Sequence, residues 1–259
     1  FRMLVLLSCA KTMSAVSKVK VPLTTIPRFQ KEAAEIALQM SQFSVDELER
    51  LLRVNAKIAV ENYKRYQAFH AETTPELPAL LAYTGIVFKR LNPKDFSAED
   101  FGYAQEHLRL TSFCYGLLRP LDVIRAYRLE GDVVLPELGN QTLFSYWRSR
   151  LTDTFIEDIR SAGGILCNLA SDEMKSLFDW KRVESEVRVI TPEFHVWKNG
   201  KLATIVVYTK MSRGEMTRFI LKNKIGNPEE LKGFSWEGFE FDESLSDERK
   251  LVFINGMGE

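Results

Sequence analysis

The chain has 259 residues, of which 45% are hydrophobic and 27% charged, so it can bury a substantial core and is not a disordered polymer. Its 35 lysine and arginine residues balance its 35 aspartate and glutamate residues. A net charge of zero excludes the strongly basic overall field of many nucleic-acid-binding proteins, so any contact with nucleic acid must depend on a local excess of charge.

The cysteines and the apolar start of the chain exclude several further classes. Cys9, Cys114 and Cys167 are odd in number and widely spaced, which argues against a disulfide framework or a zinc ribbon. The three histidines share no ligand motif, so we expect neither a metal site nor a cofactor. The apolar run 3–7 is far shorter than the ~18 residues of a membrane span, and it predicts a buried strand.

The first half of the chain, from 27 to 130, is predicted to be mostly helical. Apolar residues recur at helical spacing after Pro27 and predict one amphipathic helix. A capping-box pattern at Ser44 opens a second helix, whose apolar face continues to Tyr66. A third helix is predicted from about 98 to 110.

The second half has the pattern of a sheet. Short apolar runs bounded by glycine and polar residues predict strands at 165–171, 187–190, 194–197 and 202–209. The dipeptide Asn199-Gly200 predicts a hairpin turn, and a helix is expected at about 215–224. No linker or repeat divides the chain. We therefore predict a mixed α/β fold over residues 3–259, a single compact domain with a mixed sheet surrounded by helices.

Three stretches share one plan, in which an apolar strand is followed by a polar loop and a helical segment. They lie at 3–7, 165–169 and 203–208. If these strands are parallel neighbours, their loops meet at one edge of the sheet, where ligands bind in open α/β folds. The alternative is that each loop only caps its own helix. The first interpretation predicts a cleft formed by Ser8, Lys11, Asn168, Ser171, Glu173, Lys210 and Arg213.

Charge is distributed unevenly along the chain, and the block from 109 to 128 holds four arginines against one aspartate. The surrounding segment, about 97–126, has the pattern of a helix, a glycine-containing hairpin and a second helix that starts near Pro120. Such an element can bind phosphates through backbone amides and arginines. A tight turn packed into the core would have the same pattern. The predicted DNA contacts are Arg109, Ser112, Tyr115, Gly116, Arg119, Arg125 and Arg128.

The common catalytic fingerprints are absent from the sequence. It contains no Gly-x-Ser-x-Gly, no Walker loop and no dinucleotide-binding glycine motif. A Ser-x-x-Lys pattern begins at Ser8, but the partner motifs of serine acyl-enzymes are missing. The absence of these motifs argues against the common hydrolase, nucleoside triphosphatase and dehydrogenase functions.

Several motifs in a fixed order resemble those of one bacterial family. They are SCAKT, AQEHLRL, YGLLRPLD, YRLE, NLASDE, YTKMSRGEMTRFI and NPEELKGF. Together they resemble the YaaA peroxide stress-response family from about Met3 to Phe253. This resemblance implies a cytoplasmic protein of mixed α/β fold that limits peroxide damage by keeping unincorporated iron low. It also implies DNA binding through a helix-hairpin-helix element and a basic cleft.

The resemblance assigns particular positions, and one of them departs from the family pattern. The first motif falls on Ser8, Ala10, Lys11 and Thr12, the hairpin motifs on 112–130, and Lys-x-x-Arg-Gly on Lys210, Arg213 and Gly214. Phe113 stands where the family usually has glycine. A side chain there restricts the backbone, so we expect aromatic packing to hold the turn. Arg119 and Arg109 would then carry more of any phosphate contact than the hairpin amides.

These observations predict an oxidative stress-response protein that limits iron-dependent damage and binds duplex or branched DNA through its phosphates, with low sequence specificity. We expect no membrane association and no obligate protein partner. One alternative is an enzyme acting on a nucleotide or modified base in the cleft, with Glu173 or Asp172 as general acid or base. Another is an iron-handling or partner-binding protein that contacts no nucleic acid.

Overall fold

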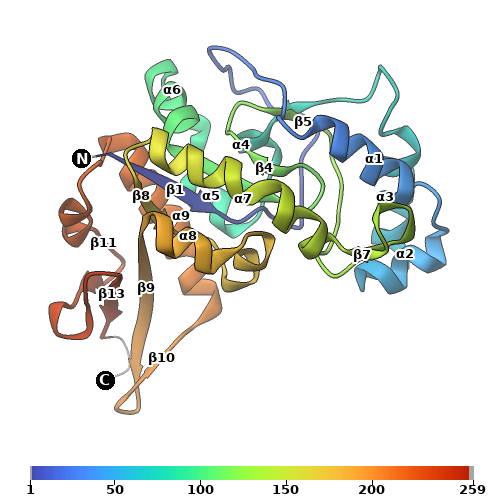
Figure 1. Ribbon diagram of the computed structural model, residues 1–259. Coiled ribbons are helices and arrows are strands. Elements are labelled where there is room, and N and C mark those ends of the chain that lie inside the picture. The colour runs from blue at the N-terminus through green and yellow to red at the C-terminus, as the bar shows by residue number, and fades with distance from the viewer. Residues whose placement is uncertain (1, 257–259) are drawn as a thin grey trace.

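A large mixed sheet forms the centre of the computed structural model, which describes residues 2–256 (Figure 1). The strands of this sheet are β1 (Met3–Leu7), β3 (Leu108–Ser112), β4 (Gly116–Leu118), β8 (Ile165–Asn168), β9 (Arg188–Lys198), β10 (Lys201–Ala203), β11 (Ser235–Trp236), β12 (Phe239–Phe241) and β13 (Lys250–Asn255). Their order is β11-β12-β13-β9-β8-β1-β3-β4, and β10 pairs with β9. Strands β13, β9, β8, β1 and β3 are parallel, and the others join antiparallel. Two small ladders pair β2 (Leu77–Pro78) with β5 (Val123–Ile124) and β6 (Val134–Leu135) with β7 (Gln141–Thr142).

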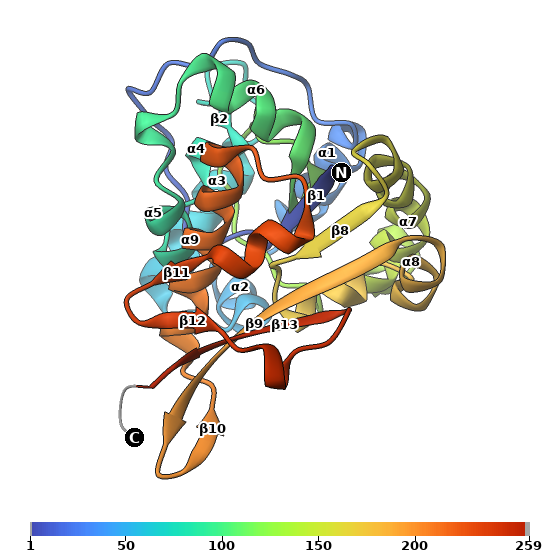
Figure 2. The ribbon, with the colours of Figure 1, turned by 90° about the vertical axis from the view of Figure 1, so that its left-hand side faces the viewer.

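Helices cover both faces of the sheet. The α-helices are α1 (Gln30–Met40), α2 (Val45–Leu52), α3 (Ala56–Ala68), α4 (Ala79–Ala82), α5 (Ile86–Leu91), α6 (Ala98–His107), α7 (Leu143–Ser161), α8 (Trp180–Glu186) and α9 (Val206–Asn223). Short 3-10 helices are η1 (Pro93–Asp95), η2 (Pro136–Leu138), η3 (Asp172–Leu177), η4 (Pro228–Gly233) and η5 (Glu243–Leu245). Helices α7 and α8 pack on one face, and α6 and α9 on the other (Figure 2). The connection from β1 to β3 ends with α6, and the connection from β3 and β4 back past β1 to β8 contains α7. These two connections run in opposite directions along the sheet, so right-handed crossovers place α6 and α7 on opposite faces.

Strand β1 lies in the middle of the core, as predicted from its apolar run. All five of its residues are buried, and it pairs in parallel with β3 on one side and β8 on the other. Strand β8 is buried in the same way. A parallel strand with helices on both faces needs apolar side chains on both sides, which explains the continuous hydrophobic runs. The predicted mixed α/β fold and its single compact domain are confirmed.

The helical region from 27 to 68 follows the prediction with one correction. Helix α1 follows Pro27, and α2 begins after Ser44 with a complete capping box. The predicted continuation of that helix to Tyr66 is wrong, because Arg53 adopts a left-handed conformation with φ 54° and ends α2. The side chain of Asn55 then accepts a hydrogen bond from the amide of Ile58 and starts α3. The apolar pattern that continues to Tyr66 is therefore divided between α2 and α3.

The predicted helix-hairpin-helix at 97–126 is also wrong. Helix α6 starts after Ser97 as predicted but ends at His107, and the next residues form β3 instead of a helical turn. The hairpin joins β3 to β4, and β5 follows Pro120 in place of a second helix. Residues 108–110 pair in parallel with the buried strand β1, and this pairing overrides the local helical pattern.

The C-terminal half differs from the prediction where α9 begins. The hairpin at Asn199-Gly200 is confirmed, with φ 53° and 74° at the two positions. The two runs predicted at 187–190 and 194–197 form one long strand, β9. The predicted strand 202–209 is wrong, because β10 ends at Ala203 and α9 starts at Val206. The β-branched residues at 205–207 favour a strand locally, but packing of α9 against α5 and α6 extends the helix over them.

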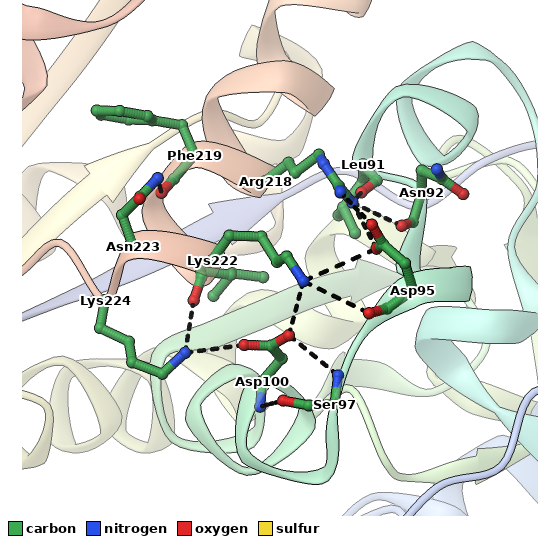
Figure 3. A network of polar contacts seen from close by, with 11 residues as sticks. Leu91, Asn92, Asp95, Ser97, Asp100, Arg218, Phe219, Lys222, Asn223 and Lys224 are labelled. Carbon is green, nitrogen blue, oxygen red and sulfur yellow. Dashed lines mark hydrogen bonds and ion pairs between the residues drawn. The ribbon is translucent and has the colours of Figure 1, made fainter.

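A network of charges joins α6 to the end of α9 (Figure 3). The buried carboxylate of Asp100 accepts hydrogen bonds from Nζ of Lys222 at 2.9 Å and from Nζ of Lys224 at 2.8 Å. It also accepts one from the amide of Ser97 at the helix N-cap. Burial opposes ionisation of Asp100, but the hydrogen bonds from Lys224, Ser97 and Lys222 outweigh it and lower its pKa. The network fixes how far α9 can slide along α6.

Replacing Asp100 with asparagine should lower the free energy of unfolding at pH 7 by about 2 kcal/mol, because hydrogen bonds to a charged partner are lost. The folded-state pKa of Asp100 is depressed, so its stabilisation is present above the unfolded value near 4 and is lost as pH falls through the folded value. Urea unfolding at pH 7 and pH 3 measures both effects. An Asp100→Asn protein whose stability falls between these pH values as steeply as that of the wild type would contradict this assignment.

Candidate functional site

A cavity of about 440 Å³ opens at the carboxyl ends of β1 and β8, beside the turn that follows β3. Strand β1 is the point at which the strand order changes direction, and such switch points form the ligand crevice of open α/β sheets. The loops after β1 and β8 meet there, because the amide of Ser171 donates a hydrogen bond to Oγ of Ser8 at 2.8 Å. The predicted meeting of these two strand ends is confirmed.

The third side of the cavity comes from α9 and not from a strand. Lys210 and Arg213 lie on this helix and line the cavity together with residues 84–88 at the start of α5, against which α9 packs. A Cβ at Gly214 would lie 2.2 Å from the carbonyl oxygen of Val87. Only glycine at this position permits so close an approach of α9 to α5, and that approach brings Lys210 and Arg213 to the cavity.

Two arginines of the cavity have no partner within the described chain. Arg128 and Arg213 are half-buried, and neither guanidinium forms a hydrogen bond or ion pair with residues 2–256. Nε of Arg128 is buried and unsatisfied. Burial lowers the pKa of Arg213, and nearby Asp172 only partly opposes this effect. The arrangement therefore leaves positive charge available to an anion inside the cavity.

Carboxylates occupy another part of the same cavity. The side chain of Glu130 is 6% exposed, and its carboxylate lies 3.2 Å from Nζ of Lys11 and 4.0 Å from a guanidinium nitrogen of Arg53. Glu173 lies at the exposed rim and has no ion pair or hydrogen bond with the described residues. Partial desolvation raises the pKa of Glu173, and the charge of Glu130 raises it further. The cavity thus combines cations with two carboxylates, and the pKa of Glu173 at its rim is raised.

Cysteine chemistry with peroxide is disfavoured at this site. Burial raises the pKa of Cys9, which lines the cavity, to about 12. Burial raises the pKa of Cys167 to about 12 and that of Cys114 further. The thiolate is the form that attacks a peroxide, and all three thiols are protonated at neutral pH.

Most of the predicted cleft residues lie around this one cavity. They are Ser8, Lys11, Ser171, Glu173, Lys210 and Arg213. Asn168 does not line it, because its Oδ1 accepts a hydrogen bond from the amide of Ala170 and holds the loop after β8. The sequence interpretation missed the wall at 84–88 and the carboxylate of Glu130. Glu130 belongs to the YRLE motif, so its place in that motif was a usable signal.

The predicted DNA-contacting arginines divide into two groups. Arg128 lines the cavity, whereas Arg109, Arg119 and Arg125 bind other parts of the protein. Nε of Arg109 donates to Asp158 at 2.7 Å, and the guanidinium of Arg119 lies 2.9 Å from the buried Asp122. The guanidinium of Arg125 donates to backbone carbonyls of residues 69 and 71. These three arginines stabilise the fold, and their positive charge is already matched.

The hairpin residues are packed inside the protein. Ser112, Tyr115 and Gly116 are buried, and a Cβ at Gly116 would lie 2.7 Å from the ring of Trp147. The ring of Phe113 is buried edge-on against Phe144, and its carbonyl accepts a hydrogen bond from Nε1 of Trp147 at 2.8 Å. Aromatic packing holds this turn as expected, but the expectation that it replaces glycine is wrong, because Gly116 has φ 77° and no room for a Cβ. Its amides are not placed on the surface for contact with a phosphate.

Two features of residues 2–256 bear on metal binding and membrane insertion. Across residues 2–256, no three histidine, cysteine, aspartate or glutamate side chains are placed to hold a metal ion together. No helix in the same part of the chain is both long and apolar enough to cross a membrane.

The fold and the cavity define a mixed α/β protein with a cavity at the switch point of its sheet that is lined by two arginines unpaired among the described residues. Residues 3–245 match the family model described as peroxide stress protein YaaA. A UPF0246 protein of Bacteroides thetaiotaomicron is 99% identical over 257 residues, which cover 99% of this chain and all of that protein. A UPF0246 protein of Bacteroides fragilis is 79% identical over 99% of this chain and all of that protein. A UPF0246 protein of Porphyromonas gingivalis is 51% identical over 97% of this chain and 99% of that protein. The chain belongs to the peroxide stress protein YaaA family, as its motifs predicted.

Proposed function

We propose that the protein serves the peroxide stress response by binding nucleic-acid phosphates at the cavity, with Arg128, Lys210 and Arg213 as the main contacts. One observation carries this proposal. The two cavity arginines lack partners in the described chain, whereas the other arginines of the 109–128 block are all bonded. A half-buried guanidinium has lost hydration and gains most from an anion that accepts its hydrogen bonds.

Duplex or branched DNA is the proposed source of these phosphates, with the backbone at the rim of the cavity and a strand end reaching the arginines inside it. Phosphate contacts carry little sequence information, so low sequence specificity is expected. Lysines at the rim, Lys11 and Lys210, are exposed and can reach a backbone outside the cavity. Limitation of iron-dependent damage and a cytoplasmic location are further proposals, and they rest on the family resemblance alone.

Fluorescence anisotropy with a short duplex of arbitrary sequence tests the proposal. Affinity should fall steeply with salt, and Arg213→Gln should weaken binding to every sequence and reduce the log-log salt slope by about 0.9. Arg160→Gln is a matched control, because Arg160 is an exposed arginine that pairs with Glu186 outside the cavity. Absence of duplex binding at low salt, or binding that both variants leave unchanged, would overturn the proposal.

A second candidate is catalysis on a nucleotide or modified base, and the raised pKa of Glu173 beside the cavity favours it. A carboxyl group with a raised pKa is suited to general acid or base work near neutral pH. Asp172 is a weaker candidate, because its side chain is 95% exposed and pairs with Lys175. Incubation with nucleotides should then give a product that Glu173→Gln no longer forms while it still binds the ligand. If wild type and variant leave all nucleotides unchanged, this candidate is excluded.

A further inference from the structure

The geometry points to a narrower ligand: we infer that the cavity receives a terminal phosphate, the phosphomonoester of a nucleotide, and not a phosphodiester inside a duplex. This inference rests on the proposed phosphate binding. A terminal phosphate has two sources, a free mononucleotide and the 5′ end of a nucleic-acid strand. Both present the same chemical group on the same sugar.

The size and depth of the site support this choice. A volume of about 440 Å³ lies in the range of small-molecule pockets. Arg128 lines the cavity and is half-buried, so an anion must enter the cavity to reach its guanidinium. A duplex carries its phosphates along the side of a stiff rod, which cannot enter a pocket of this size. A phosphate at the end of a molecule can do so.

The charge of the two arginines that are unpaired within residues 2–256 also matches a phosphomonoester. A phosphomonoester carries about −1.5 to −2 charges at pH 7, whereas a phosphodiester carries one. Arg128 and Arg213 supply two guanidinium groups, each able to bind two phosphate oxygens. The hydroxyl of Ser171 accepts a hydrogen bond from Ser8 at 3.4 Å, and its own proton is engaged by no described residue. Ser171 lines the same cavity as the two arginines, so this hydroxyl is available to donate to a bound phosphate.

The carboxylates at the cavity oppose a long polyanion. Glu173 at the rim has no cationic partner within 4 Å among the described residues, and Glu130 lies near it. A backbone that passed beside Glu173 would be repelled there, so the rim lysines favour a backbone on their own side, and a single terminal phosphate avoids most of this repulsion. The apolar side chains of Ile86, Phe88 and Met174 line the rest of the cavity and suit the sugar and the base.

The experiment compares three probes by anisotropy or calorimetry with the full chain. They are a deoxynucleoside 5′-monophosphate, a single-stranded oligonucleotide with a 5′-phosphate, and the same oligonucleotide with a 5′-hydroxyl. We expect the 5′-phosphate to strengthen oligonucleotide binding about tenfold, a factor that corresponds to about 1.4 kcal/mol. Binding of the mononucleotide alone would support the inference and identify the free nucleotide as the source. Equal affinity for the two oligonucleotides, with no mononucleotide binding, would overturn it.

Variants connect the preference to the two arginines. Arg213→Gln and Arg128→Gln should each remove the preference for the 5′-phosphate, whereas Arg160→Gln should retain it. Circular dichroism checks the fold of each variant, and the comparison of probes on the wild type decides the inference if Arg128→Gln does not fold. Salt-dependent binding of a 5′-hydroxyl duplex without any 5′-phosphate effect would overturn this inference and leave the proposed function standing. The opposite result would remove duplex binding and keep the terminal-phosphate site.

Discussion

Replacing Arg109 with alanine should lower the free energy of unfolding by about 3 kcal/mol, because the change leaves a buried ion pair without one partner. Arg109 is 8% exposed, and its Nε donates to Oδ2 of Asp158 at 2.7 Å. The guanidinium also donates to the carbonyl oxygens of Gln105 and Leu108 at 2.7 and 2.8 Å. Arg28 is a second partner of Asp158 and keeps part of its charge matched, which places the expected loss at the lower end of the range for buried pairs.

The matched control for Arg109 is Arg160, which lies on α7, the helix that carries Asp158. Arg160 forms an exposed ion pair with Glu186. Arg160→Ala should change the stability by less than about 1 kcal/mol, because the solvent screens an exposed pair. Urea unfolding at pH 7 measures both variants. If Arg109→Ala keeps wild-type stability but loses affinity for a duplex, Arg109 is a phosphate contact, as the sequence suggested, and its structural role is refuted.

The parts of the fold that the sequence predicted correctly depend on short-range signals. The capping boxes at Ser44 and Ser97 fix where α2 and α6 begin, and Asn199-Gly200 fixes the hairpin between β9 and β10. The buried strand β1 was evident from five consecutive apolar residues. Each of these signals is read within a few residues and does not depend on distant partners.

The errors occur where distant partners decide the structure. Residues 108–112 continue a helical pattern but form the strand β3. They do so because they pair with β1, a strand about a hundred residues earlier in the chain. In the same way, a β-branched start does not prevent α9, which α5 supports. Sequence patterns report local preference, and tertiary pairing overrides it at both places.

The candidate site was predicted in part for the same reason. Polar residues after β1 and β8 were expected to meet, and the parallel pairing of these strands brings them together. The sequence could not distinguish Arg128 from Arg109, because both lie in one arginine-rich block. Only the positions of the buried Asp122 and the partly buried Asp158 show which arginines are already paired.

Replacing Gly214 with alanine should lower the free energy of unfolding by about 3 kcal/mol and weaken ligand binding at the cavity. The added Cβ would lie 2.2 Å from the carbonyl oxygen of Val87 and 2.9 Å from Cβ of Arg90. The backbone of α5 or of α9 must therefore move to make room for it. Helix α9 would shift away from α5, and Arg213 would be displaced because it lies on α9. Small displacements of a binding group strongly reduce its contribution, so affinity should fall even in molecules that remain folded.

Gly102 provides the matched control, because it also lies within a helix, α6, but a Cβ there meets nothing within 4 Å. Gly102→Ala should raise stability by roughly 0.5–1 kcal/mol, since alanine loses less backbone entropy than glycine in a helix. The two glycine-to-alanine changes therefore have opposite signs, and urea unfolding of both at pH 7 separates helix propensity from packing. A Gly214→Ala protein as stable as Gly102→Ala, with unchanged affinity for a phosphate-bearing probe, would show that α5 and α9 do not need their close contact to build the site.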